Sequence, residues 1–182
     1  MKKVIYLFAL FTMFSSCDDG DIVLENLNFG NATISTCSPA TVASGLLFKA
    51  NESEILLINI PPTTFDSVTS TVENPKVLTI SNDQILYRKY SGKVSNSVIC
   101  DAIPPASPSV IDQWTGQPGG TIEIITTDIV STNQTTGVRS ITGYSNVIYF
   151  KNLQLKNDQN GFVYESYYFG EYIVTREEAI IL

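Results

Sequence analysis

Short apolar segments rich in β-branched and aromatic residues recur through most of this chain, and turn residues separate them. Valine, isoleucine, threonine and aromatic residues favour strands, whereas glycine, proline and asparagine favour turns. No apolar stripe at helical spacing accompanies them, so the pattern predicts an all-β domain, a single antiparallel β-sandwich of the immunoglobulin-like or jelly-roll-like kind. The predicted strands are residues 45–50, 54–60, 76–81, 85–90, 97–103, 121–130, 140–144, 147–156 and 162–175.

One hairpin is predicted more specifically than the rest. Asn160-Gly161 is a favoured pair for a tight turn, and it separates an alternating segment, residues 152–156, from Phe162-Val163-Tyr164-Glu165. Asp158 and Asn160 are also conceivable calcium ligands, but calcium takes about six to eight oxygens and this short stretch offers few. The hairpin turn is the preferred interpretation, and no metal site is expected.

Residues 103–120 form a proline-rich stretch, expected to be a long loop, which holds the only tryptophan, Trp114. One interpretation packs this ring over the end of a sheet. The other places it on the surface as a stacking platform, with Asp112 and Gln117 as hydrogen-bonding neighbours, which is how proteins commonly hold sugars. Both interpretations stay open at this point.

The last predicted strand carries a second aromatic set. Phe162, Tyr164, Tyr168 and Tyr172 share one face by the period of two. Packing across neighbouring strands is the ordinary role of such residues. The alternative is a tyrosine-lined ligand face, in which Tyr164, Tyr168 and Tyr144 supplement Trp114.

The composition excludes several kinds of function. The chain has 182 residues, 11 of them basic and 18 acidic, and no histidine. A net negative charge does not attract phosphate backbones, which proteins bind through lysine and arginine, so nucleic acid is not expected as a partner. Serine triads and histidine-based zinc sites are excluded. A hydrolase that uses two carboxylates stays open as an alternative, but no catalytic residue is singled out, and no cofactor is expected.

The N-terminal residues have the layout of a secretory signal. Lys2 and Lys3 precede an apolar run, residues 4–14, and Ser15-Ser16 lead into Cys17. Phe14-Ser15-Ser16-Cys17 resembles the lipobox of bacterial lipoproteins, with Phe14 where leucine is usual. The resemblance implies cleavage before Cys17 and acylation of its thiol, which anchors the protein to a membrane. The expected organisation is a signal peptide at 1–16, an acylated tether at 17–30 and a sandwich domain at 31–182.

The residues after Cys17 indicate where in the cell envelope the protein is located. Asp18, Asp19 and Asp21 resemble the acidic export signal of surface lipoproteins of the Bacteroidota. This resemblance implies the outer face of the outer membrane, whereas the same acidic start implies inner-membrane retention in enterobacterial lipoproteins. Asp66-Ser67-Val68 resembles the O-glycosylation acceptor of exported Bacteroidota proteins, which makes Ser67 a candidate site.

Export also bears on the two remaining thiols, Cys37 and Cys100. An oxidising compartment favours a disulfide between them, with two separate buried thiols as the alternative. The sequence as a whole predicts a surface-anchored lipoprotein that acts as a non-catalytic binding or cell-envelope module. Extracellular glycan is the first ligand class considered. The alternatives are an assembly subunit that contacts another envelope protein and a small carboxylate-dependent hydrolase.

Overall fold

The computed structural model describes residues 27–65 and 68–180, and of residues 177–180 it describes the backbone alone. Cys17, the acidic residues Asp18, Asp19 and Asp21, and Ser67 lie outside the described residues, so the lipidation, export and glycosylation sites stay predictions. In the part of the chain that is described, no helix is long and apolar enough to cross a membrane.

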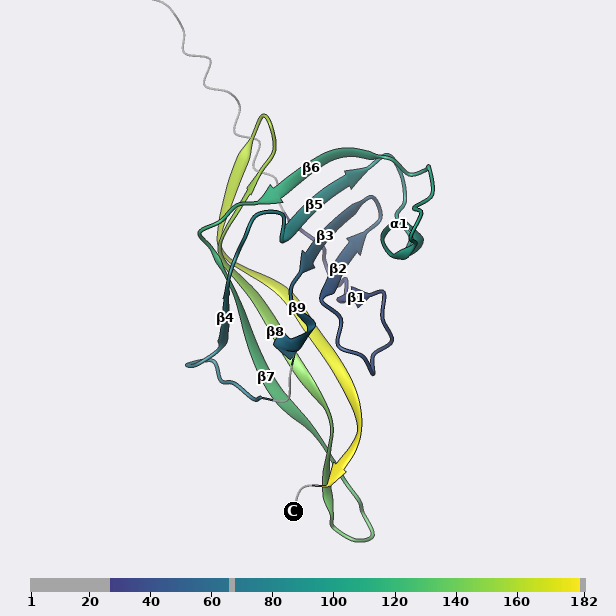
Figure 1. The fold of residues 1–182 in the computed structure, drawn as a ribbon, viewed down its shortest axis with the longest axis vertical. Helices are drawn as coiled ribbons and strands as arrows, with labels where there is room; N and C mark the ends of the chain where they lie inside the picture. Colours follow the sequence, from purple (N-terminus) through teal and green to yellow (C-terminus); the bar gives the residue numbers. More distant parts are fainter. Residues whose placement is uncertain (1–26, 66–67, 181–182) are drawn as a thin grey trace, which may run out of the picture.

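The described chain forms one antiparallel sheet of nine strands, which confirms the all-β prediction (Figure 1). The sheet order is β1-β2-β3-β5-β6-β8-β7-β4, and β9 pairs with β8. The sheet is continuous and open, so a sandwich of two separate sheets is not confirmed. The strands are β1 (Ser35–Thr36), β2 (Leu46–Asn51), β3 (Glu54–Asn59), β4 (Lys76–Thr79), β5 (Ile85–Tyr90), β6 (Val110–Gly116), β7 (Thr121–Thr132), β8 (Arg139–Lys156) and β9 (Gly161–Ile180). Two short helical turns are η2 (Pro62–Phe65) and α1 (Ser97–Cys100).

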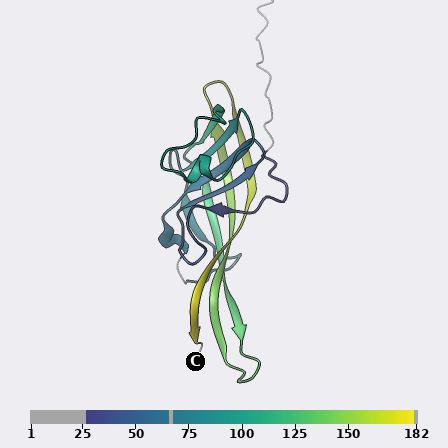
Figure 2. The same ribbon diagram turned by 90° about the vertical axis from the view of Figure 1, so that its right-hand side faces the viewer.

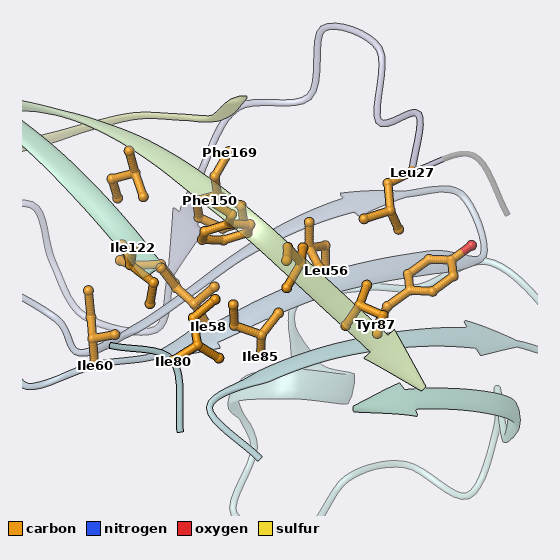
Figure 3. Close-up of a cluster of buried hydrophobic side chains, with 14 of the residues drawn as sticks. Leu27, Leu56, Ile58, Ile60, Ile80, Ile85, Tyr87, Ile122, Phe150 and Phe169 are labelled. Carbon is orange, nitrogen blue, oxygen red and sulfur yellow. The ribbon is translucent and has the colours of Figure 1, made fainter. Parts of the chain in front are cut away.

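The sheet turns back on itself where β6 meets β8. These strands pair only through Thr115 with Lys156 and Gly116 with Leu155. The two halves of the sheet therefore face each other, and the main core forms between them from residues of both halves. Figure 3 shows Leu56 and Ile58 of β3 close to Ile122 and Phe150 of β7 and β8.

A smaller cluster covers the other face of β2, β3 and β5. It consists of Phe48, Ile55, Tyr90 and Val98, and Val98 belongs to α1. The predicted disulfide is present: Cys37 is bonded to Cys100, with their Cα atoms 5.4 Å apart. The bond attaches α1 to the segment that follows β1.

Two predicted elements around α1 were wrong. Residues 97–103 were expected to form a strand, but 97–100 form one helical turn whose Val98 packs into the smaller cluster. Residues 103–120 were expected to form a loop, but 110–116 form β6, which pairs with β5. The prolines lie at 104, 105, 108 and 118, on either side of this interval, so no proline removes a backbone donor from the ladder, which has one register shift at Ile111.

The other predicted strand boundaries differ less from those of the structure. The strands predicted at 140–144 and 147–156 are one strand, β8. The predicted hairpin is present, with Lys156 opposite Gly161 and the Asn157 N–H donating to the Asn160 carbonyl at 2.9 Å. Leu27 and Phe29 are buried in the main core, although they lie in the stretch expected to be tether.

The last three strands extend past the body of the molecule as an arm (Figures 1 and 2). The arm consists of the C-terminal end of β7, the N-terminal end of β8 and the C-terminal end of β9. Its inner end is tied by buried polar side chains. Thr126 Oγ1 donates to Asn146 Oδ1 at 2.9 Å, and Asn146 Nδ2 donates to the Tyr172 carbonyl at 3.2 Å. This network holds β9 against β8.

Candidate functional site

Trp114 lies in the core, and not on a loop at the surface. Its side chain is 2% exposed and belongs to the main hydrophobic cluster. The ring centroid lies 5.1 Å from that of Tyr87 and 6.2 Å from that of Phe162. The interpretation of Trp114 as a surface platform is therefore wrong, because its ring faces are already covered by neighbouring side chains.

Asp112 and Gln117 line a polar cleft of about 690 Å³ beside the β8–β9 hairpin turn. Asn157 connects residues on two sides of this cleft by hydrogen bonds. Its Nδ2 donates to Asp112 Oδ1 at 3.2 Å, while its Oδ1 accepts from the backbone N–H groups of Gln159 and Asn160. Asp158 also lines the cleft. The cleft thus offers carboxylate and amide groups without an aromatic platform.

The predicted tyrosines do not join this cleft. Tyr144 is buried near the base of the arm, where the Arg176 guanidinium lies 4.9 Å from the ring centroid. Tyr164 and Tyr168 line a different feature, an open groove of about 1050 Å³ between β9 and residues 27–40. The six predicted ligand residues therefore fall in four places: the main core, the base of the arm, the polar cleft and the groove.

The groove forms because residues 27–40 follow β9 in the same direction without pairing with it as a strand. Two tyrosine hydroxyls of β9 hold this N-terminal part of the chain: Tyr164 accepts from the Leu27 N–H at 2.8 Å, and Tyr172 accepts from the Ser44 N–H at 2.9 Å. Between them, Ile34 packs on Gly170, where a Cβ would lie only 3.0 Å from Ile34 Cγ1. Tyr164 thus has a structural role.

The edge of β9 that faces away from β8 is largely unpaired. Among the described residues, one backbone hydrogen bond is recorded on this edge, from the Thr175 N–H to the Ala40 carbonyl at 3.0 Å. Backbone groups of alternate residues point to the same edge of a strand. The N–H and C=O groups of Ile173 and Glu171 are therefore directed to the same open edge, and both residues line the groove.

Lys49 of β2 is a groove residue that the sequence interpretation missed. It lies two residues after Leu47, so its side chain shares the face that points to the main core. It is 6% exposed, and no hydrogen bond or ion pair joins it to another described residue. Burial lowers the pKa of its ammonium group. The available signal was a lysine at an inward position of a predicted strand.

The tyrosines beside the groove are packed against one another. Tyr167 stacks on Phe150 with ring centroids 6.0 Å apart and lies 5.8 Å from Tyr164. Burial, and secondly the neighbouring Tyr164, raise the pKa of Tyr167 to about 12. The Tyr167 hydroxyl therefore keeps its proton at neutral pH and can act as a donor.

No group of three or more histidine, cysteine, aspartate or glutamate side chains suited to a metal ion occurs among the residues described. No family profile, curated protein or solved structure matches the chain. The site is therefore defined by its own geometry: an apolar and aromatic groove, an open strand edge along one wall and a buried lysine.

Proposed function

We propose that this protein is a lipid-anchored module of the bacterial cell envelope that binds a protein partner along the open edge of β9. The observation that carries the proposal is the unpaired edge beside the groove. An exposed row of backbone N–H and C=O groups is a template on which another extended chain can pair. Adding a strand to a sheet edge in this way is a common mode of peptide recognition, with neighbouring pockets that select side chains.

The proposed location rests on the N-terminal resemblance. Acylation of Cys17 would hold the module at the membrane, and the acidic residues Asp18, Asp19 and Asp21 favour the outer surface. No enzymatic role is proposed. The groove offers binding groups, and the proposal accounts for it without a reaction.

The edge can be tested by removing one backbone donor. Ile173→Pro deletes an N–H directed to the open edge, whereas Ile173→Ala keeps that N–H and shortens the side chain. A photo-crosslinking residue at Tyr168, which lines the groove, reports the bound partner in intact cells. We expect a discrete crosslinked product that Ile173→Pro abolishes and Ile173→Ala retains.

The same crosslinker at Val77 on β4, which is exposed and does not line the groove, serves as the control and should give no such product. Thermal unfolding should show both Ile173 variants folded, because the deleted N–H takes no part in the ladder with β8. If Ile173→Pro fails to fold, Glu171→Pro tests the same edge. A product that persists in the folded proline variant would exclude pairing with β9.

A second candidate is a glycan in the polar cleft. The favouring observation is that Asp112, Gln117 and Asn157 converge there, although they lie on different elements. Side chains of these types commonly bind sugar hydroxyls by hydrogen bonds. Binding of the wild type to a glycan array that Asp112→Ala abolishes, while the exposed Asp83→Ala does not, would support this candidate; absence of binding by the wild type would eliminate it.

A further inference from the structure

Lys49 places a positive charge inside the groove, and no side chain among the described residues pairs with it. The Lys49 side chain is 6% exposed, and its ammonium group is partly desolvated where it opens into the groove. Desolvation of a charge costs free energy unless the charge is paired. In the described chain, no carboxylate forms an ion pair with it. Glu171 also lines the groove, but its carboxylate accepts a hydrogen bond from Ser145 Oγ on the neighbouring strand. The groove therefore contains a positive charge that no carboxylate among the described residues neutralises, and an anionic group could bind there.

The surroundings of Lys49 indicate what else the anion must carry. Ile34, Tyr167 and Ile173 line the same groove, so apolar and aromatic side chains share it with the charge. A small, fully hydrated anion would gain little from such walls. An occupant with apolar groups on both sides of its negative charge would bury them and neutralise Lys49 together.

Two occupants combine a negative charge with apolar groups: a fatty acid, whose carboxylate lies at one end of its acyl chain, and an extended peptide, whose acidic side chain can lie between apolar residues. The open edge of β9 distinguishes them, because its N–H and C=O groups alternate along the wall of the groove. A peptide backbone satisfies both kinds of group in register, whereas an acyl chain satisfies neither. The strand edge and the lysine therefore favour the peptide.

We propose that the groove binds an extended peptide segment that carries an acidic side chain, with the Lys49 ammonium group as the counterion of that carboxylate. This inference rests on the proposed function and adds the chemistry of the partner. Apolar residues are expected at positions flanking the acid.

A random nonapeptide library displayed on phage provides the probe. Selection on the wild-type protein is expected to enrich one acidic position flanked by apolar residues. Synthetic peptides from this selection should bind Lys49→Met about 10- to 100-fold more weakly than wild type, as expected for loss of a charge-assisted hydrogen bond. Lys49→Arg should retain most of the affinity, because it retains the charge.

The matched control replaces the acid of the selected peptide by its amide. That change should weaken binding to the wild type by a similar factor and should cause little further loss in Lys49→Met, because the two groups form one interaction. Lys49→Met should be folded and at least as thermally stable as wild type, since it removes an unpaired buried charge.

The outcomes separate the two proposals. Peptides that bind and are sensitive to Ile173→Pro, but show no preference for acid over amide, would overturn the role of Lys49 and leave edge pairing intact. Selection of no peptide would overturn both. Binding of a fluorescent fatty acid that depends on Lys49 and is not displaced by any selected peptide would make the groove a lipid site and reject the peptide.

Discussion

At the scale of single residues, Trp114 and Lys49 are both buried, but in different places: one packs in the core and the other lines the groove. Trp114 fills the space between the two halves of the sheet, with Tyr87 and Phe162 against its ring. Its Nε1 is buried and has no hydrogen-bond partner in the described part of the chain. Lys49 is also buried, but it lines the groove instead of filling the core. The first residue contributes packing, and the second is the counterion of the proposed peptide site.

The burial of Trp114 predicts a large effect on stability. Trp114→Ala should lower the free energy of unfolding by about 3–5 kcal/mol, the usual range for removing a large buried aromatic side chain. Trp114→Phe should lower it by less, because the indole N–H has no hydrogen bond to lose. Urea unfolding of the three proteins measures both differences. A loss below about 1 kcal/mol for Trp114→Ala would contradict its placement in the core.

At the scale of elements, β9 both builds the core and forms one wall of the groove. Phe169, Tyr172 and Val174 are buried in the main core, while Glu171 and Ile173 line the groove. β8 satisfies one edge along the whole strand, and the other edge meets residues 27–40 at few points. The groove consequently depends on how the segment from Leu27 to Ala40 is held in place.

The Cys37–Cys100 disulfide is one of the attachments of that segment, since Cys37 follows β1 directly. The two cysteines are separated by 63 positions. Closing a loop of this size contributes at most about 4 kcal/mol by restricting the unfolded chain, and measured values are often nearer 2. Cys37→Ser/Cys100→Ser should therefore lower the unfolding free energy by about 2–4 kcal/mol in urea titrations. Two alkylatable thiols in the native protein isolated from its host would show that the bridge does not form there.

At the scale of the whole molecule, the described chain begins at Leu27, beside Tyr164 at one end of the groove. Residues 18–26 separate it from Cys17. An extended chain spans at most about 3.5 Å per residue, so such a tether would keep Leu27 within roughly 35 Å of an acylated Cys17. The arm of β7, β8 and β9 lies toward the opposite end of the fold (Figure 1). The proposed anchor would therefore keep the groove close to the membrane.

The anchor itself can be tested by Cys17→Ser. Several acyl chains on one cysteine bind a bilayer firmly, because each buried CH₂ contributes about 0.8 kcal/mol. The variant should therefore move from the detergent phase to the aqueous phase on phase partition, while the wild type stays with detergent. Cys37→Ser/Cys100→Ser serves as the control and should partition like wild type. Equal partition of Cys17→Ser and wild type would reject acylation at this cysteine.

Part of this fold could be predicted because its signals are local. β5 lies at the predicted residues 85–90, and β2, β3 and β7 lie within two residues of their predicted bounds, since β-branched and aromatic runs favour strands wherever they pack. The hairpin was predicted at the correct place, but not for the expected reason: neither Asn160 nor Gly161 adopts a positive φ, and residues 157–160 form the turn before Gly161 begins β9. The disulfide followed from a count of the remaining thiols in a chain expected to be exported.

The site depended on tertiary structure, because burial is decided by what packs against a side chain and not by the side chain itself. The sequence alone determined that strands follow one another with turns between them and that no histidine is available for catalysis or metal binding. It also placed a cysteine where a lipobox would have one. Only the folded chain decided that Trp114 is covered, that residues 97–100 form α1, and that Lys49 faces inward with no partner among the side chains the structure describes. The groove walls at Leu27 and Tyr164 are 137 positions apart, a distance over which no local pattern carries information.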